Sequence, residues 1–133
     1  MGLTKATLKV KGRKGARQIE LIVDTGSVYT WIPAETLEEL DVPKDDFVDF
    51  TTIEGRRVRR PVGEALLGYN GVSRHCVVVF GRRGDASVLG VTALENLALE
   101  VDPVSRKLRK SKALAAYQCQ VTAKALARLF STM

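Results

Sequence analysis

The tripeptide Asp24-Thr25-Gly26 is the part of the chain whose residue types are best suited to chemistry. Asp24 supplies a carboxylate, which can take up or release a proton during a reaction. Gly26 lets the backbone turn tightly because it has no Cβ, and the Thr25 hydroxyl can hold such a turn. The apolar run over residues 21–23 comes directly before Asp24 and predicts a buried strand that delivers the carboxylate to a fixed position.

A second apolar run that ends in glycine, Val88-Leu89-Gly90, lies far downstream and comes before an expected helix. Thr92 and Glu95 have the spacing of a capping box, which predicts that this helix begins at Thr92. A strand that ends in a turn containing Asp and Gly is common, so the first tripeptide alone indicates no function. The presence of both runs, in this order, is more informative than either run alone.

With these two runs, residues 3–108 resemble the retropepsin-like aspartic proteases, the family of the retroviral proteases and their cellular single-domain relatives. Two apolar residues precede Asp24, and Thr30 follows where the family often has a small hydroxyl residue. Residues 88–90 look like the family's second apolar-apolar-Gly element, which crosses near the first and braces the active-site loop. Residues 99–102 are similar to the closing strand and turn of many cellular members.

The resemblance implies a mainly β fold: a closed small β-barrel of the retropepsin-like acid protease type, with short helices and one lobe per chain. The 133 residues leave room for one domain with a modest core. A two-lobed pepsin-like enzyme would need two Asp-Thr-Gly loops, whereas this chain has one. Because pepsin-type catalysis uses two carboxylates that share one proton, the second must come from another chain. We therefore expect a symmetric homodimer in which Asp24 and its mate meet on the two-fold axis.

The activity implied by the resemblance is that of an aspartic endopeptidase that needs no cofactor. One Asp24 would be protonated and the other ionised, since two like charges at close range cannot both ionise cheaply. The ionised carboxylate would take a proton from a water that attacks the peptide carbonyl. By the motif match, Thr25 braces the two loops across the interface and Gly26 offers backbone groups to the peptide.

Residues 47–67 occupy the place of the family's flap, a hairpin that folds over bound peptide. Glu54 and Gly55 stand near its tip, where a glycine suits a tight and mobile turn. The substrate, an extended peptide or unfolded protein, would lie between the flap and the active-site floor and bond as an added strand. The expected substrate-binding residues are Ser27, Val28, Ile53, Glu54, Gly55 and Val88.

Four arginines follow the flap tip and motivate a hypothesis about specificity. They are Arg56, Arg57, Arg59 and Arg60, and their charge could favour acidic peptides. Apolar subsites could be formed by Val28, Tyr29, Trp31 and Ile32, some of which must instead belong to the core.

Other segments read as scaffold. Alternation of polar and apolar residues over 4–10 predicts a half-buried strand, and residues 11–15 look like the loop that follows it. A short helix is expected over residues 33–40, because a proline suits its first turn, with Leu37 and Leu40 facing inward. Residues 69–72 have Asn-Gly at their centre, which predicts a type I′ hairpin.

The composition changes near residue 110, which divides the chain into a protease domain over residues 1–109 and a C-terminal helical extension over 110–133. Apolar residues of the extension are spaced as one side of a helix: Leu114, Tyr117, Val121, Leu126, Leu129 and Phe130. Two interpretations remain open at this point. The helix either packs on its own domain or adds a dimer contact.

Composition limits the partners. The net charge is +6, yet both signs are scattered along most of the chain, and aromatic residues make up 6%, too few for a base-stacking platform, so nucleic acid is not an expected partner. Cys76 and Cys119 are expected as buried reduced thiols, which fit a reducing compartment. With His75 as the single histidine, no metal site is expected. No apolar stretch is long enough to span a membrane and the N-terminus is polar, so we expect a soluble, cytoplasmic protein.

The alternative function is a non-catalytic peptide- or nucleic-acid-binding module on the same fold. The basic flap and the C-terminal extension motivate it. The intact motif at Asp24 argues against it, since a pure binding domain has no need of an acid at that turn. A stable monomer would favour the binding module, because a monomer cannot form the carboxylate pair.

Overall fold

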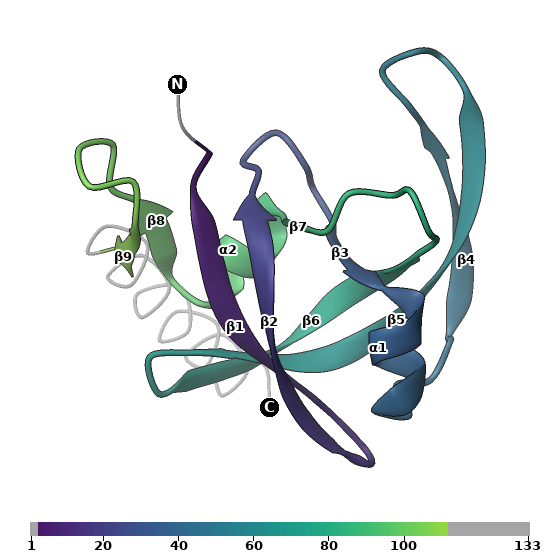
Figure 1. Ribbon diagram of the computed structural model, residues 1–133, viewed down its shortest axis with the longest axis horizontal. Coiled ribbons are helices and arrows are strands. Elements are labelled where there is room, and N and C mark those ends of the chain that lie inside the picture. The colour runs from purple at the N-terminus through teal and green to yellow at the C-terminus, as the bar shows by residue number, and fades with distance from the viewer. Residues whose placement is uncertain (1–2, 112–133) are drawn as a thin grey trace, which may run out of the picture.

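The computed structural model describes residues 3–111, and in that range the chain is mainly β with two short helices (Figure 1). The elements in chain order are β1 (Lys5–Gly12), β2 (Gly15–Val23), β3 (Thr30–Pro33), α1 (Ala34–Glu39), β4 (Asp46–Thr51), β5 (Arg57–Tyr69), β6 (Val72–Gly81), β7 (Val88–Leu89), α2 (Val91–Asn96), β8 (Leu99–Val101) and β9 (Leu108–Lys110). The predicted mainly β class is confirmed. From residue 112 on, the predicted C-terminal extension lies outside the described residues, as does Cys119.

Strand β1 arises from the predicted alternation of polar and apolar residues. Its buried residues are Ala6, Leu8 and Val10, and the residues between them are exposed. Strand β2 pairs with it antiparallel, and the register places Gly12 opposite Gly15. Because both glycines belong to strands, the loop expected over residues 11–15 is reduced to the turn between them.

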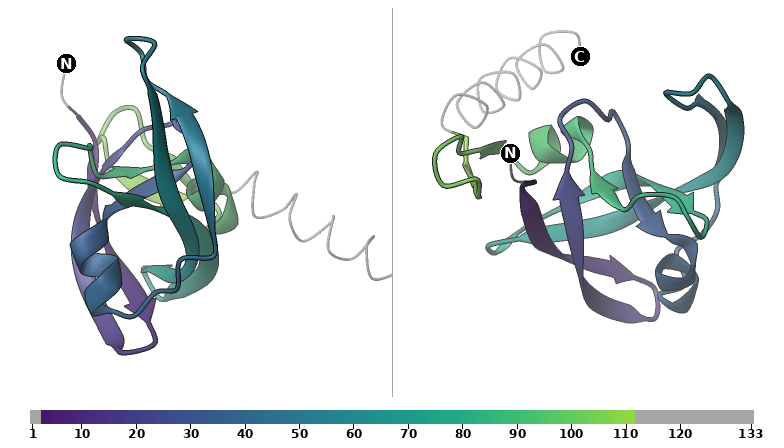
Figure 2. Two further views of the ribbon diagram at one scale, coloured as in Figure 1. Left: turned by 90° about the vertical axis from the view of Figure 1, so that its right-hand side faces the viewer. Right: turned by 45° about the horizontal axis from the view of Figure 1, so that its top comes forward.

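The main sheet has the strand order β1-β2-β7-β3-β6-β5-β4. An additional pairing of β1 with β5 closes all of its strands except β4 into a ring. Strand β4 stays outside this ring as the edge partner of β5, so the β4–β5 hairpin projects from the rest of the fold (Figure 2). Strand β7 runs parallel to β2 and antiparallel to β3, which puts it between the two strands that flank the Asp24 loop.

The core lies inside the ring and is continuous with the inner sides of both helices. Its most deeply buried side chains include Leu8, Leu21, Ile32, Leu37, Leu67, Phe80 and Leu89. Each such side chain contributes about 1.5–3 kcal/mol through its removal from water. The predicted inward positions of Leu37 and Leu40 are confirmed, and Pro33 ends β3 directly before α1.

The turn between β5 and β6 confirms the Asn-Gly prediction. Asn70 has φ 47° and Gly71 has φ 80°, and two successive positive φ values are what a type I′ turn requires. The strands on either side pair in register from Tyr69 opposite Val72 outward.

Helix α2 begins one residue before the predicted start, and the Thr92 capping box is not formed. The residue that precedes the helix is Gly90, and no side chain caps it. The physical reason is that the first helical N–H groups already have partners: Val91 donates to the Ser27 carbonyl and Thr92 to the Val28 carbonyl, at 2.7 and 3.3 Å. The Asp24 loop thus takes the place of a side-chain cap.

Strand β8 and the turn that begins at Asp102 confirm the closing strand and turn expected over residues 99–102, and β9 pairs with β8 after that turn. Cys76 is a buried free thiol, and desolvation raises its pKa above the ordinary value. Among residues 3–111, neither helix has the length and apolar character needed to cross a membrane.

Candidate active site

Asp24 follows the last residue of β2 and is held there by backbone bonds on both sides of the strand. The Asp24 N–H donates to the Leu89 carbonyl of β7 at 3.0 Å, and the Val23 N–H donates to the Thr4 carbonyl at 2.8 Å. The preceding Leu21 is fully buried, whereas Asp24 itself is exposed. Of the run predicted to be buried, only Leu21 is buried, while Ile22 and Val23 are half-buried. The hydrogen-bonded end of β2 therefore presents a solvent-accessible carboxylate.

The turn after Asp24 orients that carboxylate. The Gly26 N–H donates to Asp24 Oδ1 at 3.0 Å, and the Ser27 N–H donates to the Asp24 carbonyl at 3.1 Å. Thr25 is exposed, and its side chain makes no hydrogen bond within residues 3–111. Over the same residues Asp24 has no ion-pair partner, so its second oxygen can take a water or a substrate group.

The two apolar-Gly runs of the sequence cross directly beside this turn. The Gly90 N–H donates to the Thr30 hydroxyl at 3.0 Å, and Thr30 is 1% exposed. A Cβ on Gly90 would lie 2.4 Å from the Tyr29 carbonyl oxygen and 2.8 Å from that of Ser27, so only glycine fits. This contact between residues 60 positions apart fixes the Asp24 loop to the start of α2.

The structure brings three of the expected substrate-binding residues close to Asp24 and separates three others from it. Ser27 continues the turn, its hydroxyl donating to the Tyr29 carbonyl at 2.7 Å, and Val28 is 59% exposed. Val88 is half-buried in β7, where it pairs with Ile22. Ile53, Glu54 and Gly55 lie at the tip of the β4–β5 hairpin, which extends to the same upper side of the molecule as the loop after β2 (Figure 1).

Among residues 3–111, the hydrogen bonds of the hairpin tip are all to other residues of the hairpin. The Thr52 N–H donates to the Arg56 carbonyl at 2.8 Å, and the Thr52 hydroxyl accepts the Arg56 N–H at 3.1 Å. Gly55 has φ 85°, as expected of a glycine that closes a tight turn. Ile53 is fully exposed.

An aromatic cluster that sequence reasoning missed joins the hairpin to the Asp24 loop. The Phe50 ring of β4 lies 5.4 Å from the Tyr29 ring in a T-shaped contact and 4.8 Å from the Trp31 ring. The sequence does carry a clue, because Tyr29 and Trp31 are two apart and so share one face of an extended chain. Tyr29 and Trp31 are therefore partly covered by the hairpin.

An ion pair between a buried arginine and a half-buried aspartate, also missed, joins the hairpin to the loop before β7. Arg60 is 7% exposed, and its Nε and Nη2 donate to the Asp85 carboxylate at 2.8 and 3.2 Å. The same carboxylate accepts the Arg82 N–H at 2.7 Å. The hydrogen bonds from Arg60 lower the pKa of Asp85, and Asp85 in turn raises the pKa of Arg60.

This pair reduces the number of flap arginines that are available to attract an acidic peptide. Arg60 is occupied by Asp85, and Arg59 contacts Asp49 at 3.7 Å on the opposite face of β5. Arg57 shares that outer face by alternation. Only Arg56 and Arg57 have no ion-pair partner among residues 3–111, so the acidic-peptide hypothesis rests on those two side chains.

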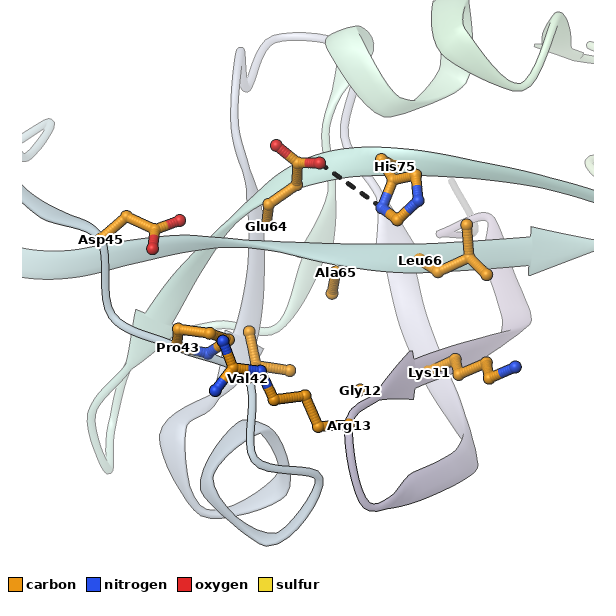
Figure 3. Close-up of a pocket in the computed structure, with 10 residues that line it drawn as sticks. All are labelled: Lys11, Gly12, Arg13, Val42, Pro43, Asp45, Glu64, Ala65, Leu66 and His75. Carbon is orange, nitrogen blue, oxygen red and sulfur yellow. Dashed lines mark ion pairs between the residues drawn. The ribbon is translucent and has the colours of Figure 1, made fainter.

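A pocket of about 580 Å³ lies at the other end of β2 from Asp24 (Figure 3). It is lined by Lys11, Gly12, Arg13, Val42, Pro43, Asp45, Glu64, Ala65, Leu66 and His75. Figure 3 shows Glu64 beside His75, with 3.4 Å between carboxylate oxygen and Nδ1. No predicted site residue lines it. Within residues 3–111, no three His, Cys, Asp or Glu side chains gather in a way that could hold a metal ion.

No protein-family model and no curated protein matches the sequence. The comparison with solved structures found a retropepsin-like aspartic protease from Rickettsia conorii, with a TM-score of 0.46 and 16% sequence identity. The matched region covers 77% of this chain and 89% of that one.

Proposed function

We propose that the protein is an aspartic endopeptidase that hydrolyses peptide bonds as a homodimer, with one Asp24 from each protomer in the catalytic pair. The observation that carries the proposal is the exposed Asp24 carboxylate. It stands at the end of β2, is oriented by the Gly26 N–H, and has no ion-pair partner within residues 3–111. A carboxylate that served only as a turn former would not need this support from Leu89, Thr30 and Gly90.

In the proposed reaction, the two carboxyls share one proton and hold a water between them. The ionised Asp24 takes a proton from the water, whose oxygen bonds to the peptide carbonyl carbon, while the protonated Asp24 donates to the developing oxyanion. The carbon–nitrogen bond then breaks as the leaving amine takes the proton that the first Asp24 gained from the water, and a hydroxyl of the tetrahedral intermediate returns its proton to the other Asp24 as the new carboxyl group forms. Thr25 is assigned to contacts between the two loops of the dimer, where its exposed side chain is available.

Exposed apolar side chains in segments on the same side of the molecule as the Asp24 loop support the dimer. The most exposed large apolar residues among those described include Leu3, Val28, Ile53 and Val104. They belong to the chain before β1, the loop after β2, the tip of the β4–β5 hairpin and the turn between β8 and β9. All four segments reach the upper side of the molecule in Figure 1, the side on which the Asp24 loop opens. A second copy placed on this side would bury them together with the catalytic pair.

The substrate assigned to this site is an extended peptide. Ser27, Val28 and Val88 would line its floor, and Ile53, Glu54 and Gly55 would cover it from the hairpin. A tip held only by its own bonds can close over a peptide without breaking contacts elsewhere.

The test is cleavage of an unfolded protein by wild type and Asp24→Asn in parallel, at about pH 3 to 7 and at high protein concentration, where a carboxylate pair is active and dimers form. We expect wild type to cut and Asp24→Asn to lose the activity. Asp49→Asn, an exposed carboxylate on the outer face of the hairpin, serves as the control and should cut normally. Equal cleavage by wild type and Asp24→Asn, or none by wild type, would overturn the proposal; the latter result would favour a binding module.

A further inference from the structure

Side chains at two levels fix the middle of the β4–β5 hairpin to the rest of the fold. Phe50 on β4 packs against Tyr29 and Trp31, and Arg60 on β5 is bound by the Asp85 carboxylate. Both side chains lie on the inner face of the hairpin, because Phe50 pairs with Val58, two residues before Arg60. Within the described part of the chain, tip residues 52–56 hydrogen-bond only with one another.

The Arg60 partner is part of the segment that holds Asp24. Asp85 stands in the loop between β6 and β7, and two residues later the Ser87 carbonyl accepts the Ile22 N–H of β2 at 3.2 Å. The Leu89 carbonyl then accepts the Asp24 N–H. Arg60 is therefore linked to the Asp24 loop through a short run of hydrogen-bonded backbone.

A buried ion pair is weak evidence for stability, because desolvation of the two charges offsets most of their attraction. What a bidentate pair does provide is geometry, since the planar guanidinium meets a carboxylate in one orientation. The Arg59–Asp49 pair on the same hairpin provides a contrast. Its atoms are 3.7 Å apart and both side chains are 70% exposed, so it constrains little.

We propose that Arg60 and Asp85 are positioning residues, which set the β4–β5 hairpin at the angle it needs to cover peptide over the Asp24 loop. The effect on peptide cleavage rests on the proposed function. The effect on hairpin position rests on the contacts alone. Loss of the pair leaves the contact of Phe50 with Tyr29 and Trp31 as the remaining side-chain attachment described above, and we expect that contact to loosen.

The position of the hairpin can be followed without any activity, because Trp31 is the single tryptophan of the chain and lies against Phe50. We expect Asp85→Asn to shift Trp31 emission to the red and to increase its quenching by acrylamide, since the indole loses part of its cover. Asp49→Asn removes a carboxylate from the same hairpin and should leave both readings at the wild-type value. Unchanged Trp31 readings in Asp85→Asn would overturn the positioning role.

A double variant, Arg60→Met with Asp85→Asn, separates the effect of the pair on hairpin position from its effect on stability. The single variant Asp85→Asn leaves the Arg60 charge unpaired and should be less stable than wild type. The double variant removes both charges, so stability should return to about the wild-type level or above it. The directional contact stays lost, and we expect kcat/KM for peptide cleavage to remain roughly 10- to 100-fold below wild type, mainly through KM. Full recovery of kcat/KM along with stability would mean that the pair acts only on stability and would overturn the inference.

The two proposals fail in distinguishable ways. If Asp24→Asn cuts as well as wild type, the proposed function is wrong, while the Trp31 measurement still decides whether Asp85 holds the hairpin. If Asp24→Asn is inactive and Trp31 is unaffected by Asp85→Asn, the protease stands and the positioning role does not.

Discussion

Gly90 is the residue at which the absence of a side chain matters most for the candidate site. Its backbone passes so close to the Asp24 loop that a Cβ would overlap carbonyl oxygens of Tyr29 and Ser27. Those oxygens belong to the main chain, so neither can rotate aside as the end of a flexible side chain could. The hydrogen bond from the Gly90 N–H to the Thr30 hydroxyl depends on this approach.

We therefore expect Gly90→Ala to lower the free energy of unfolding by about 1–3 kcal/mol or more and to abolish cleavage. Urea unfolding followed by circular dichroism measures the first effect. Gly81→Ala is the matched control, because its nearest atom would be the Ile32 carbonyl oxygen at an ordinary 3.4 Å. Equal unfolding midpoints for the two variants would show that the Asp24 loop can move to accept a side chain.

At the scale of elements, the β4–β5 hairpin has two faces with different surroundings. The inner face carries Phe50 and Arg60, each with a partner elsewhere in the fold. The outer face carries Phe47, which is 55% exposed and lies 5.6 Å from the Arg59 guanidinium. Attachment of the hairpin thus depends on the inner face. The contribution of the Arg60–Asp85 contact to the free energy of unfolding should depend on pH.

Hydrogen bonds from Arg60 lower the pKa of Asp85 below its ordinary value of 3.8. Because the folded pKa is below the unfolded one, the Asp85 carboxylate stabilises the fold fully above the unfolded pKa and loses this contribution as pH falls through the folded pKa. We expect the difference in free energy of unfolding between wild type and Asp85→Asn to be constant from about pH 7 to 5 and to shrink below about pH 4. Urea titrations at each pH measure it, and a difference that grows as pH falls would contradict this linkage.

Local sequence was sufficient for elements whose physics is local. The Asn70-Gly71 turn follows from two residues that tolerate positive φ, and β1 follows from its alternation of Ala6, Leu8 and Val10 with exposed residues. The motif at Asp24 likewise predicted a strand that ends in a tight turn, which is present.

Contacts between distant residues were beyond the reach of local patterns. Arg60 reads as one of four flap arginines, and nothing in the sequence pairs it with Asp85, 25 positions away. The Thr92 capping box failed for a similar reason, because Ser27 and Val28 already accept the first helical N–H groups. In both cases a contact with a residue distant in the sequence determined the structure, and the local pattern did not contain that contact.

At the scale of the whole molecule, the ring of strands supplies one carboxylate, and the proposed chemistry needs two. In the proposed homodimer the second carboxylate is Asp24 of another copy, and the exposed Asp24 and apolar residues motivate that proposal. The proposed dimer predicts how activity changes when wild type is mixed with an inactive variant, since each active site would contain one Asp24 from each of two chains.

We expect wild type and Asp24→Asn, mixed in equal amounts and allowed to exchange subunits, to show about one quarter of the activity of the same total amount of wild type. Random pairing makes about one quarter of the dimers fully wild type, and a mixed dimer lacks one carboxyl of the pair. A protein whose site lies within one chain would instead retain about one half, because Asp24→Asn would only dilute it. Cleavage rates at a fixed total concentration measure this, and sedimentation of the same samples establishes that the chains are dimeric. Activity that stays proportional to the wild-type fraction in such samples would place the whole reaction on a single protomer and remove the reason for the pair.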